Sequence, residues 1–290
     1  AIFLQQVVNG MSLGGMYALI AIGYTMVYGV LRLINFAHAD VMMVGAFSTL
    51  FLFSSVGLPF GVAVFLTLGL CGLFGMLIDR VAYRPLRQAS KISMLITAIG
   101  VSYLLQSIAQ LIFGAKAQSV SLPSLGAVNI AGTNVSVSSI LTMGISAVIM
   151  IALTLFIKKT RTGRAMLAVS EDRGAAQLMG INVNKIITVT FAIGSALAAF
   201  ASVFYLFQIP TAEPTLGSMP GIKAFTAAVI GGIGSIPGAM IGGFAIGLLE
   251  ALVSAVGLSI WKDGVVFAIL IVVLLVKPTG ILGRPQTEKV

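Results

Sequence analysis

Charged residues are scarce in this sequence: Asp, Glu, Lys and Arg make up 9% of its 290 residues, whereas apolar residues make up 58%. Soluble domains contain roughly 25% charged residues. With so few charges, a soluble chain of this length could not cover its surface. The composition therefore excludes an ordinary water-soluble domain and indicates a protein surrounded by lipid.

Cysteine and histidine are nearly absent, with 1 residue of each. The single cysteine, Cys71, excludes an intramolecular disulfide, and its apolar surroundings in the sequence predict a packing role. Because His38 is the only histidine, no Cys/His cluster can hold a metal ion, and we expect no metal site in this chain. The first basic residue is Arg32, so we do not expect a cleaved signal peptide, which would need a basic start.

Long uncharged runs take the place of the missing charges, for example residues 62–78, 140–157 and 265–276. Crossing a bilayer takes about 20 mostly apolar residues in a helix, and the alternation typical of a β-barrel is missing. We therefore predict an all-α membrane protein, a polytopic bundle of about eight (8–9) transmembrane helices with broken or re-entrant segments. The predicted helices cover residues 4–30, 39–56, 60–79, 92–113, 138–157, 187–208 and 263–280, with an inward and a returning arm between 221 and 257.

Lysine and arginine gather in three regions, which the positive-inside rule assigns to the cytoplasm. The regions are Arg80 to Lys91, Lys158 to Lys185, and the tail with Lys277, Arg284 and Lys289. The connections 114–137 and 208–221 carry only Lys116 and Glu213 and are predicted on the other side, with the N-terminus. The net charge of +9 then follows from topology. Nucleic-acid binding, which needs a basic folded surface, is not expected.

Residues 33–40 (LINFAHAD) interrupt the hydrophobic pattern between the first two helices. Irregular backbone at membrane depth is tolerated inside protein or beside a water-filled cavity, and such breaks often border substrate routes. We therefore predict that Asn35, His38 and Asp40 form a gate or part of a translocation path. The alternative is a plain helix start, with Asn35 as the cap and Asp40 near the positive end of the helix dipole.

A second break, GGIGSIPG at residues 231–238, predicts a hairpin turn within the membrane. Its turn-forming residues are Gly234, Ser235, Pro237 and Gly238. The two arms carry Lys223 and Glu250, whose depths differ by only about 6 Å at 1.5 Å per residue. A charge near mid-bilayer costs about 2.5–3.5 kcal/mol, so we predict an ion pair that joins the arms. The alternative is that Lys223 extends to the outer interface.

The longest predicted cytoplasmic connection, residues 158–186, contains a predicted surface helix at Glu171–Met179. Ser170 is expected to cap its start, and Glu171 and Asp172 suit the positive end of the dipole. Gly180 is placed as its C-terminal stop. Such a helix can dock in a groove on a partner protein; the alternative is a merely solvated interfacial helix.

The chain resembles the LivH-type permease subunits of bacterial high-affinity branched-chain amino-acid ABC importers. The matching stretches are YALIAIGYTMV (17–27), INFAH (34–38), RVAYRP (80–85), residues 171–182, KAFTAAVIGGIGSIPGAMIGG (223–243) and PTGILGRP (278–285). They run through essentially the whole chain, and the fifth is highly specific. One departure is Ala39, where the family usually has Gly.

The resemblance implies that residues 1–290 form a single ABC-importer transmembrane domain in the bacterial inner membrane, with a cytoplasmic C-terminus. The partners it implies are a second, related permease, two cytoplasmic ATP-binding subunits and a periplasmic binding protein. Leucine, isoleucine and valine would be imported by alternating access. The chain has no Walker A sequence, G-x-x-x-x-G-K-[ST], so we expect a non-catalytic subunit that binds no cofactor, with ATP and Mg²⁺ held by its partners.

The coupling helix implied by the resemblance lies in the connection 158–186, and its expected contacts with the ATPase are Glu171, Asp172, Ala175, Ala176, Leu178 and Gly180. Other cargoes, such as urea, amides or other amino acids, stay open. An ion-coupled secondary transporter is a further alternative, because Lys223 and Glu250 could serve as intramembrane coupling sites.

Overall fold

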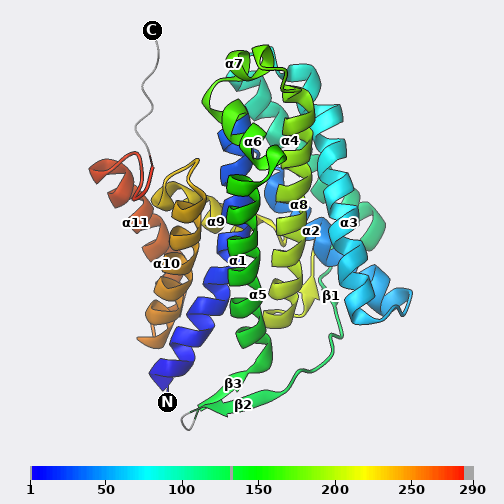
Figure 1. Cartoon of the computed structure of the whole chain (residues 1–290). Coiled ribbons are helices and arrows are strands. Elements are labelled where there is room, and N and C mark those ends of the chain that lie inside the picture. Colours follow the sequence, from blue (N-terminus) through cyan, green and yellow to red (C-terminus); the bar gives the residue numbers. More distant parts are fainter. Residues whose placement is uncertain (1, 131–132, 284–290) are drawn as a thin grey trace.

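The structure, a computed structural model, describes residues 2–130 and 133–283 and consists mainly of helices (Figure 1). The helices are α1 (Ile2–Leu31), α2 (His38–Thr49), α3 (Phe60–Ile78), α4 (Lys91–Phe113), α5 (Val137–Lys159), α6 (Arg161–Glu171), α7 (Arg173–Leu178), α8 (Val183–Gln208), α9 (Ser218–Gly231), α10 (Ile236–Ala255) and α11 (Lys262–Val276). Two π-helical turns, η1 (Leu50–Ser55) and η2 (Asp79–Tyr83), extend α2 and α3, and two short 3-10 helices are η3 (Arg84–Leu86) and η4 (Ser259–Trp261).

Eight helical segments within the described residues are long and apolar enough to cross a membrane. They contain α1, α2, α3, α4, α5, α8, α10 and α11. The predicted all-α membrane bundle is therefore confirmed. Its boundaries differ little from the predicted ones. The helix α8 begins at Val183 and not at 187, because the Asn182 side chain caps its first turn by accepting a hydrogen bond from the Lys185 amide. The third span continues to Leu86 and not to 79, and α11 ends at Val276 and not at 280.

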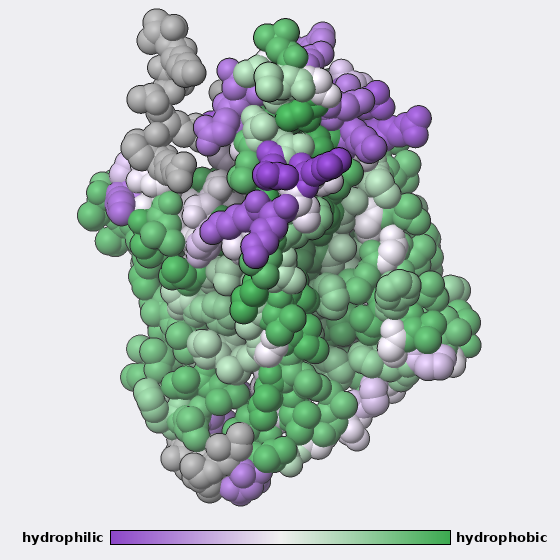
Figure 2. All heavy atoms as spheres, viewed as in Figure 1, coloured by the Kyte–Doolittle hydropathy of each residue, from purple (hydrophilic) through white to green (hydrophobic). Residues whose placement is uncertain are grey.

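The helix α1 lies at the centre of the bundle, with 83% of its most apolar window buried, whereas the same measure is 17% for α4 and 6% for α11. Of all the helices around it, α10 makes the most extensive contact with α1, because small residues let the two backbones approach each other. A Cβ atom on Gly247 would lie 2.2 Å from the backbone nitrogen of Gly14. Apolar residues cover the sides of the bundle, and hydrophilic ones gather at the end that carries α6 and α7 (Figure 2).

Two helices begin inside the bundle after a non-helical segment. His38, the first residue of α2, packs against Gly23 of α1. Gly23 lies eight residues before the end of α1 at Leu31, so α2 begins about 12 Å back from that end of the helix. The helix α9 spans only 14 residues, about 21 Å, and is shorter than the ~30 Å hydrocarbon core. The starts of α2 and α9 meet, since a Cβ atom on Gly217 would lie 2.2 Å from the carbonyl oxygen of Ala39.

The connection 208–221, predicted as a loop on the outer side, turns into the bundle instead. Leu216 is only 3% exposed, and α9 already begins at Ser218. An extended segment can enter because strand β4 (Thr211–Ala212) pairs with β1 (Gln118–Ser119), which satisfies its backbone groups. The short helix α9 agrees with the predicted broken or re-entrant segments, whereas the extended entry of the chain before it was not predicted.

The connection 114–137 also contains strands that were not predicted. β2 (Ala127–Ile130) pairs with β3 (Thr133–Ser136) in an antiparallel hairpin, with Val128 opposite Val135. The hairpin lies at the end of the bundle opposite α7 (Figure 1). Pairing gives the amide and carbonyl groups of a long polar loop their hydrogen-bond partners.

The last described residues fold back onto the turn between α9 and α10. The amides of Ile281 and Leu282 donate to the carbonyl oxygens of Ile230 and Gly231. The predicted basic tail residues Arg284 and Lys289, and the end of the 278–285 match, lie outside the described residues.

Candidate transport and coupling sites

The connection between α5 and α8 contains two helices where one was predicted. The helix α6 continues through Glu171, and α7 begins only at Arg173. The predicted cap Ser170 is wrong: its hydroxyl donates to the Leu167 carbonyl oxygen inside α6. Asp172 is the cap, because its carboxylate accepts a hydrogen bond from the Ala175 amide at 3.0 Å. The predicted helix Glu171–Met179 is thus shortened to six residues, since Asp172 breaks the helix with an extended backbone.

The end of α7 has the glycine stop that the sequence predicts. Gly180 has a φ of +83°, which favours glycine. Its amide donates to Gln177, and the Ile181 amide donates to Ala176. This pair of bonds is the Schellman motif, which ends the helix and turns the chain towards α8.

The exposed face of α7 differs from the predicted one. Ala176 is only 4% exposed because it packs against this chain's own core, whereas Leu178 and Met179 are 90% and 83% exposed. Ala175, Glu171 and Asp172 are also exposed. Two large apolar side chains thus lie exposed next to each other at the end of α7. The sequence reasoning missed Met179, although its position next to the Gly180 stop could have pointed to it.

Arginine side chains tie the α6–α7 segment to the end of α1. The Arg173 guanidinium donates to the Val30 carbonyl oxygen from Nε at 3.0 Å and from Nη2 at 2.6 Å. In return, Arg32 Nη2 donates to the Ser170 carbonyl oxygen at 2.7 Å. Burial and the nearby positive charges of Arg87 and Arg32 lower the pKa of Arg173. The α6–α7 segment is therefore hydrogen-bonded to the end of α1, directly before the break between α1 and α2.

Asn35, His38 and Asp40 are all buried, with exposures of 4%, 1% and 1%. They do not form one polar cluster, because each contacts a different helix. The Asn35 Oδ1 atom accepts from the Tyr83 hydroxyl at 2.5 Å, and Asp40 Oδ1 accepts from Gln106 Nε2 at 2.9 Å.

The His38 ring packs edge-on against Tyr24, with ring centroids 4.9 Å apart. Its Nε2 atom has no hydrogen-bond partner among the described residues. A Cβ atom on Gly23 would lie only 2.2 Å from Nε2, so this glycine makes room for the imidazole. The alternative in which Asn35 caps α2 is wrong, since the N-cap residue is Ala37 and no side chain caps this helix.

Lys223 lies between two carboxylates. Its Nζ atom is 2.9 Å from Glu250 Oε1 and 2.7 Å from Asp263 Oδ1. The Tyr17 hydroxyl donates to the other Glu250 oxygen at 3.3 Å. The structure thus brings the predicted pair together and excludes the alternative in which Lys223 extends away from Glu250. Asp263 was missed, although its place in the first turn of α11 offered a signal.

The turn between α9 and α10 is built as its residue types indicate. Gly234 has a φ of +94°, and the Ser235 hydroxyl caps α10 by accepting from the Gly238 amide at 3.2 Å. Pro237 stands in the first turn, where its missing amide costs nothing. A Cβ atom on Gly238 would lie 2.2 Å from the Gly231 carbonyl oxygen, so the two arms touch.

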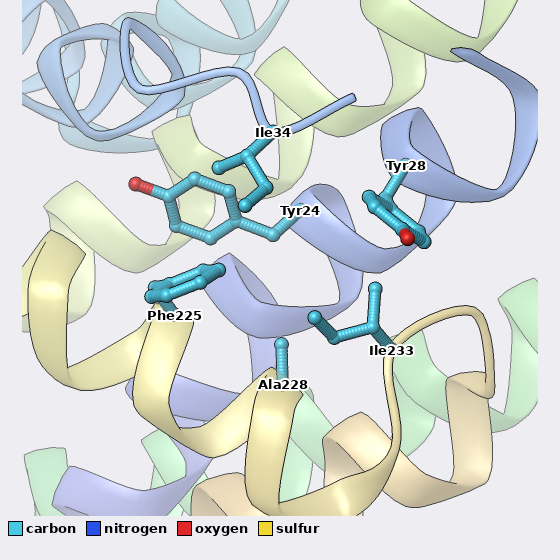
Figure 3. Close-up of a pocket in the computed structure, with 6 residues that line it drawn as sticks. All are labelled: Tyr24, Tyr28, Ile34, Phe225, Ala228 and Ile233. Atoms are coloured by element: carbon cyan, nitrogen blue, oxygen red, sulfur yellow. The ribbon is translucent and has the colours of Figure 1, made fainter. Parts of the chain in front are cut away.

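A small apolar cavity lies between this turn and the first break (Figure 3). The ring of Tyr24 lies between Ile34 and Phe225, and the Tyr24 and Phe225 ring centroids are 6.0 Å apart. The other lining residues are Tyr28, Ala228 and Ile233. The two broken regions therefore adjoin each other in the folded chain.

A polar cluster that sequence reasoning missed joins the end of α3 to α8. Arg87 Nη2 lies 2.5 Å from Asp79 Oδ1 and also contacts Asn184, and the Thr188 hydroxyl donates to Asp79 Oδ2 at 2.6 Å. Among the described residues, no group of three or more His, Cys, Asp or Glu could hold a metal ion.

Comparison with known proteins identifies the family. Residues 6–274 match the family model described as branched-chain amino acid transport system / permease component. The chain is 46% identical to the permease protein BraD of Pseudomonas aeruginosa, over 99% of this chain and 98% of that protein. It is 47% identical to the permease protein LivH of Escherichia coli K12, with the same coverage.

Both relatives are described as high-affinity branched-chain amino acid transport system permease proteins. Among solved structures, PsaBC from Streptococcus pneumoniae in complex with Fab aligns with 92% of this chain and 90% of its own, at a TM-score of 0.48 and 16% identity. The family model and the two permeases similar to nearly the whole chain identify its family, and the eight candidate spans suit a membrane permease. The chain belongs to the family of branched-chain amino-acid transport permeases.

Proposed function

We propose that this chain is the membrane permease subunit of an ABC importer that carries leucine, isoleucine and valine into the cytoplasm by alternating access. The observation that carries the proposal is the 46–47% identity to high-affinity branched-chain permeases over 99% of the chain. The subunit itself is non-catalytic. ATP and Mg²⁺ bind to partner subunits, which supply the energy for transport.

The proposed partners are a second, related permease that completes a heterodimer, two cytoplasmic ATP-binding subunits and a periplasmic binding protein. The protein lies in the bacterial inner membrane, with the α6–α7 end and the C-terminus in the cytoplasm. The basic residues at that end support this orientation, because lysine and arginine collect on the cytoplasmic side. Figure 2 agrees, since its hydrophilic residues gather around α6 and α7.

The proposed coupling element is α7, at residues 173–178 within the cytoplasmic connection 158–186. Leu178 and Met179 would enter a groove on the ATP-binding subunit, with Ala175 beside them. Glu171 and Asp172 would affect the association rate more than the affinity, because they lie at the rim. Ala176 would hold the segment against the core from inside, and Gly180 would end the helix. The Arg173–Val30 contact supports a transmission route from α7 to α1.

The proposed gate is the region where the breaks before α2 and α9 meet. Asn35, His38 and Asp40 would hold α2 against α1, α4 and η2, and a shift of the α1 end would loosen them together. The Gly234–Gly238 turn adjoins this region, and the Lys223 ion pairs keep its arms together while the surroundings move. The contact between Ala39 and Gly217 supports a joint movement of α2 and α9.

Reconstitution tests the proposal. The chain is purified with its second permease and both ATP-binding subunits, placed in liposomes, and supplied with binding protein and ATP. We expect ATP-dependent uptake of labelled leucine, isoleucine and valine. Uptake of urea or amides in preference would assign another cargo, and uptake driven by an ion gradient without the ATP-binding subunits would contradict an ABC importer.

A further inference from the structure

Within residues 103–110, one face of α4 is polar although the helix lies at the outside of the bundle, whereas the same face is apolar and exposed nearer the start of the helix, at Ile96 and Ile99. Tyr103, Gln106, Ser107 and Gln110, here called the α4 polar face, follow the spacing i, i+3, i+4, i+7 that brings side chains to one side of a helix. Tyr103 is 66% exposed, Ser107 and Gln110 are also exposed, and Gln106 is half-buried.

Hydrocarbon cannot surround this face at low cost. Polar groups moved from water into an apolar medium without partners lose several kcal/mol in stability. The opposite side of α4 offers the bilayer exposed apolar residues such as Ile108 and Ile112. The α4 polar face therefore meets water or polar groups in the assembled protein.

Asp40 lies directly behind the α4 polar face. Gln106 Nε2 donates to its Oδ1 atom at 2.9 Å, and Ser102 lies beside the same carboxylate. The Oδ2 atom is buried and has no hydrogen-bond partner among the described residues. Asp40 is only 1% exposed, so its Oδ2 atom is a buried hydrogen-bond acceptor that lies next to the α4 polar face.

Asp40 differs from the other acidic residues in the candidate spans. Asp79 pairs with Arg87, and Glu250 and Asp263 both pair with Lys223. No described lysine or arginine nitrogen lies within 4.0 Å of Asp40. An ionisable residue inside the membrane marks a functional site whose partner has to be named. Because the described residues supply no cation to Asp40, we expect its partner to come from outside them.

We propose that Asp40 binds the α-ammonium group of the amino acid in transit, and that the α4 polar face lines the water-filled passage leading to it. The inference rests on the proposed function, because that function supplies a zwitterionic cargo. An ammonium group is a cation with three donors, which suits a carboxylate with one free oxygen. Asp40 thereby attracts the polar end of the substrate, while selectivity for the side chain is left to other groups.

Cysteine labelling tests the passage in the assembled importer, in a Cys71→Ala background. Ser107→Cys and Gln110→Cys should react with small, membrane-impermeant thiol reagents about tenfold or more faster than the matched neighbour Ile108→Cys, which faces lipid. If Ser107→Cys and Gln110→Cys react no faster than Ile108→Cys in every nucleotide state, the α4 polar face is buried against another subunit and the proposal is overturned.

Reagent charge tests Asp40. At Gln110→Cys, the ratio of the cationic to the anionic reaction rate should be about tenfold higher than the same ratio for free cysteine, because a carboxylate concentrates cations nearby. Asp40→Asn should remove the preference and Asp40→Glu should keep it. Gln106→Cys, with Asp40 unchanged, should show a larger preference than Gln110→Cys. A preference that survives Asp40→Asn, or that does not increase towards Gln106, overturns the proposal.

Substrate protection separates an amino acid from an inorganic cation. Leucine delivered by the binding protein should slow labelling at Gln110→Cys, whereas sodium or ammonium ions at equal ionic strength should not; equal protection by the ions would contradict amino-acid binding. Uptake by the unlabelled importer is measured in parallel. Absence of any uptake would refute the proposed function, whereas normal uptake with an unreactive α4 polar face would refute only this inference.

Discussion

The guanidinium of Arg173, at the start of α7, holds the carbonyl oxygen of Val30 with two hydrogen bonds, 3.0 and 2.6 Å long. Val30 is the last residue but one of α1, directly before the break that leads to α2. A surface helix suited to contact a partner is thus fixed to the most deeply buried helix of the bundle, and the consequences can be measured.

Replacing Arg173 should uncouple ATP hydrolysis from transport. Arg173→Ala removes both bonds to Val30, and hydrogen bonds from a charged group contribute roughly 1.5–3 kcal/mol. We expect leucine uptake per ATP hydrolysed to fall at least about fivefold, with the ATP-binding subunits still attached. Arg164→Ala, at an exposed arginine of α6, is the matched control and should behave as wild type. Unchanged coupling in Arg173→Ala would show that α7 acts by another route.

Removing the exposed apolar side chains at the end of α7 should weaken attachment of the ATP-binding subunit. Burying a side chain such as Leu178 or Met179 contributes about 1.5–3 kcal/mol, so each alanine variant should lose about 10- to 100-fold in affinity. Leu167→Ala in α6 removes a partly exposed leucine outside the proposed contact and is the control. Binding is measured by titrating purified ATP-binding subunits; equal affinities for all three variants would remove α7 from the contact.

A substitution at Ala176 cannot test attachment of the ATP-binding subunit, although the sequence predicts that this residue contacts the subunit. The residue is buried in this chain's own core, so a larger side chain would distort the connection itself. Inserting extra methylenes into a packed site costs about 1–3 kcal/mol. We expect Ala176→Leu to lower the thermal stability of the isolated permease in detergent, before any partner is added. Unchanged stability would mean that α7 can move away from α8.

Lys223 should matter more for stability than either of its partners. Lys223→Met leaves the buried Glu250 and the partly exposed Asp263 without a cation, and breaking a buried pair such as Lys223–Glu250 in this way costs about 3–5 kcal/mol. Glu250→Gln leaves the Lys223–Asp263 pair intact and should cost less. The triple change Lys223→Met, Glu250→Gln, Asp263→Asn should recover part of the loss in thermal unfolding experiments. A single Lys223→Met variant as stable as wild type would argue against the network.

The fit of His38 against Gly23 can be tested by a paired substitution. Gly23→Ala would place its methyl carbon 2.2 Å from His38 Nε2, so α1 and α2 would have to separate. We expect uptake to be largely lost in Gly23→Ala and partly restored in Gly23→Ala/His38→Ala. Gly29→Ala is the control, because a Cβ atom there meets no atom within 4 Å. His38→Ala alone should slow transport with assembly intact if the break before α2 is a gate.

The sequence alone predicts that the chain forms a bundle of about eight (8–9) membrane-spanning helices and places most of their ends within a few residues. Hydrocarbon requires each span to be a long apolar helix, and this requirement acts on local composition, so runs such as 140–157 are read directly as α5. The turn at Gly234–Gly238 could also be predicted, since glycine, serine and proline determine local backbone and capping geometry. The whole-chain resemblance to branched-chain permeases likewise rests on the sequence alone.

Apart from the Lys223–Glu250 pair, which the sequence predicted, tertiary structure decided which side chains meet. Asp172 and not Ser170 caps α7, because α6 continues as far as Glu171 and so includes Ser170. Asp263 joins Lys223, and Gln106 joins Asp40, across separations in the chain that leave no local pattern. The entry of residues 209–217 into the bundle depends on pairing of β4 with a distant strand. Helix formation in a membrane is a local matter, whereas these contacts depend on how the helices pack, and only the folded chain brings their partners together.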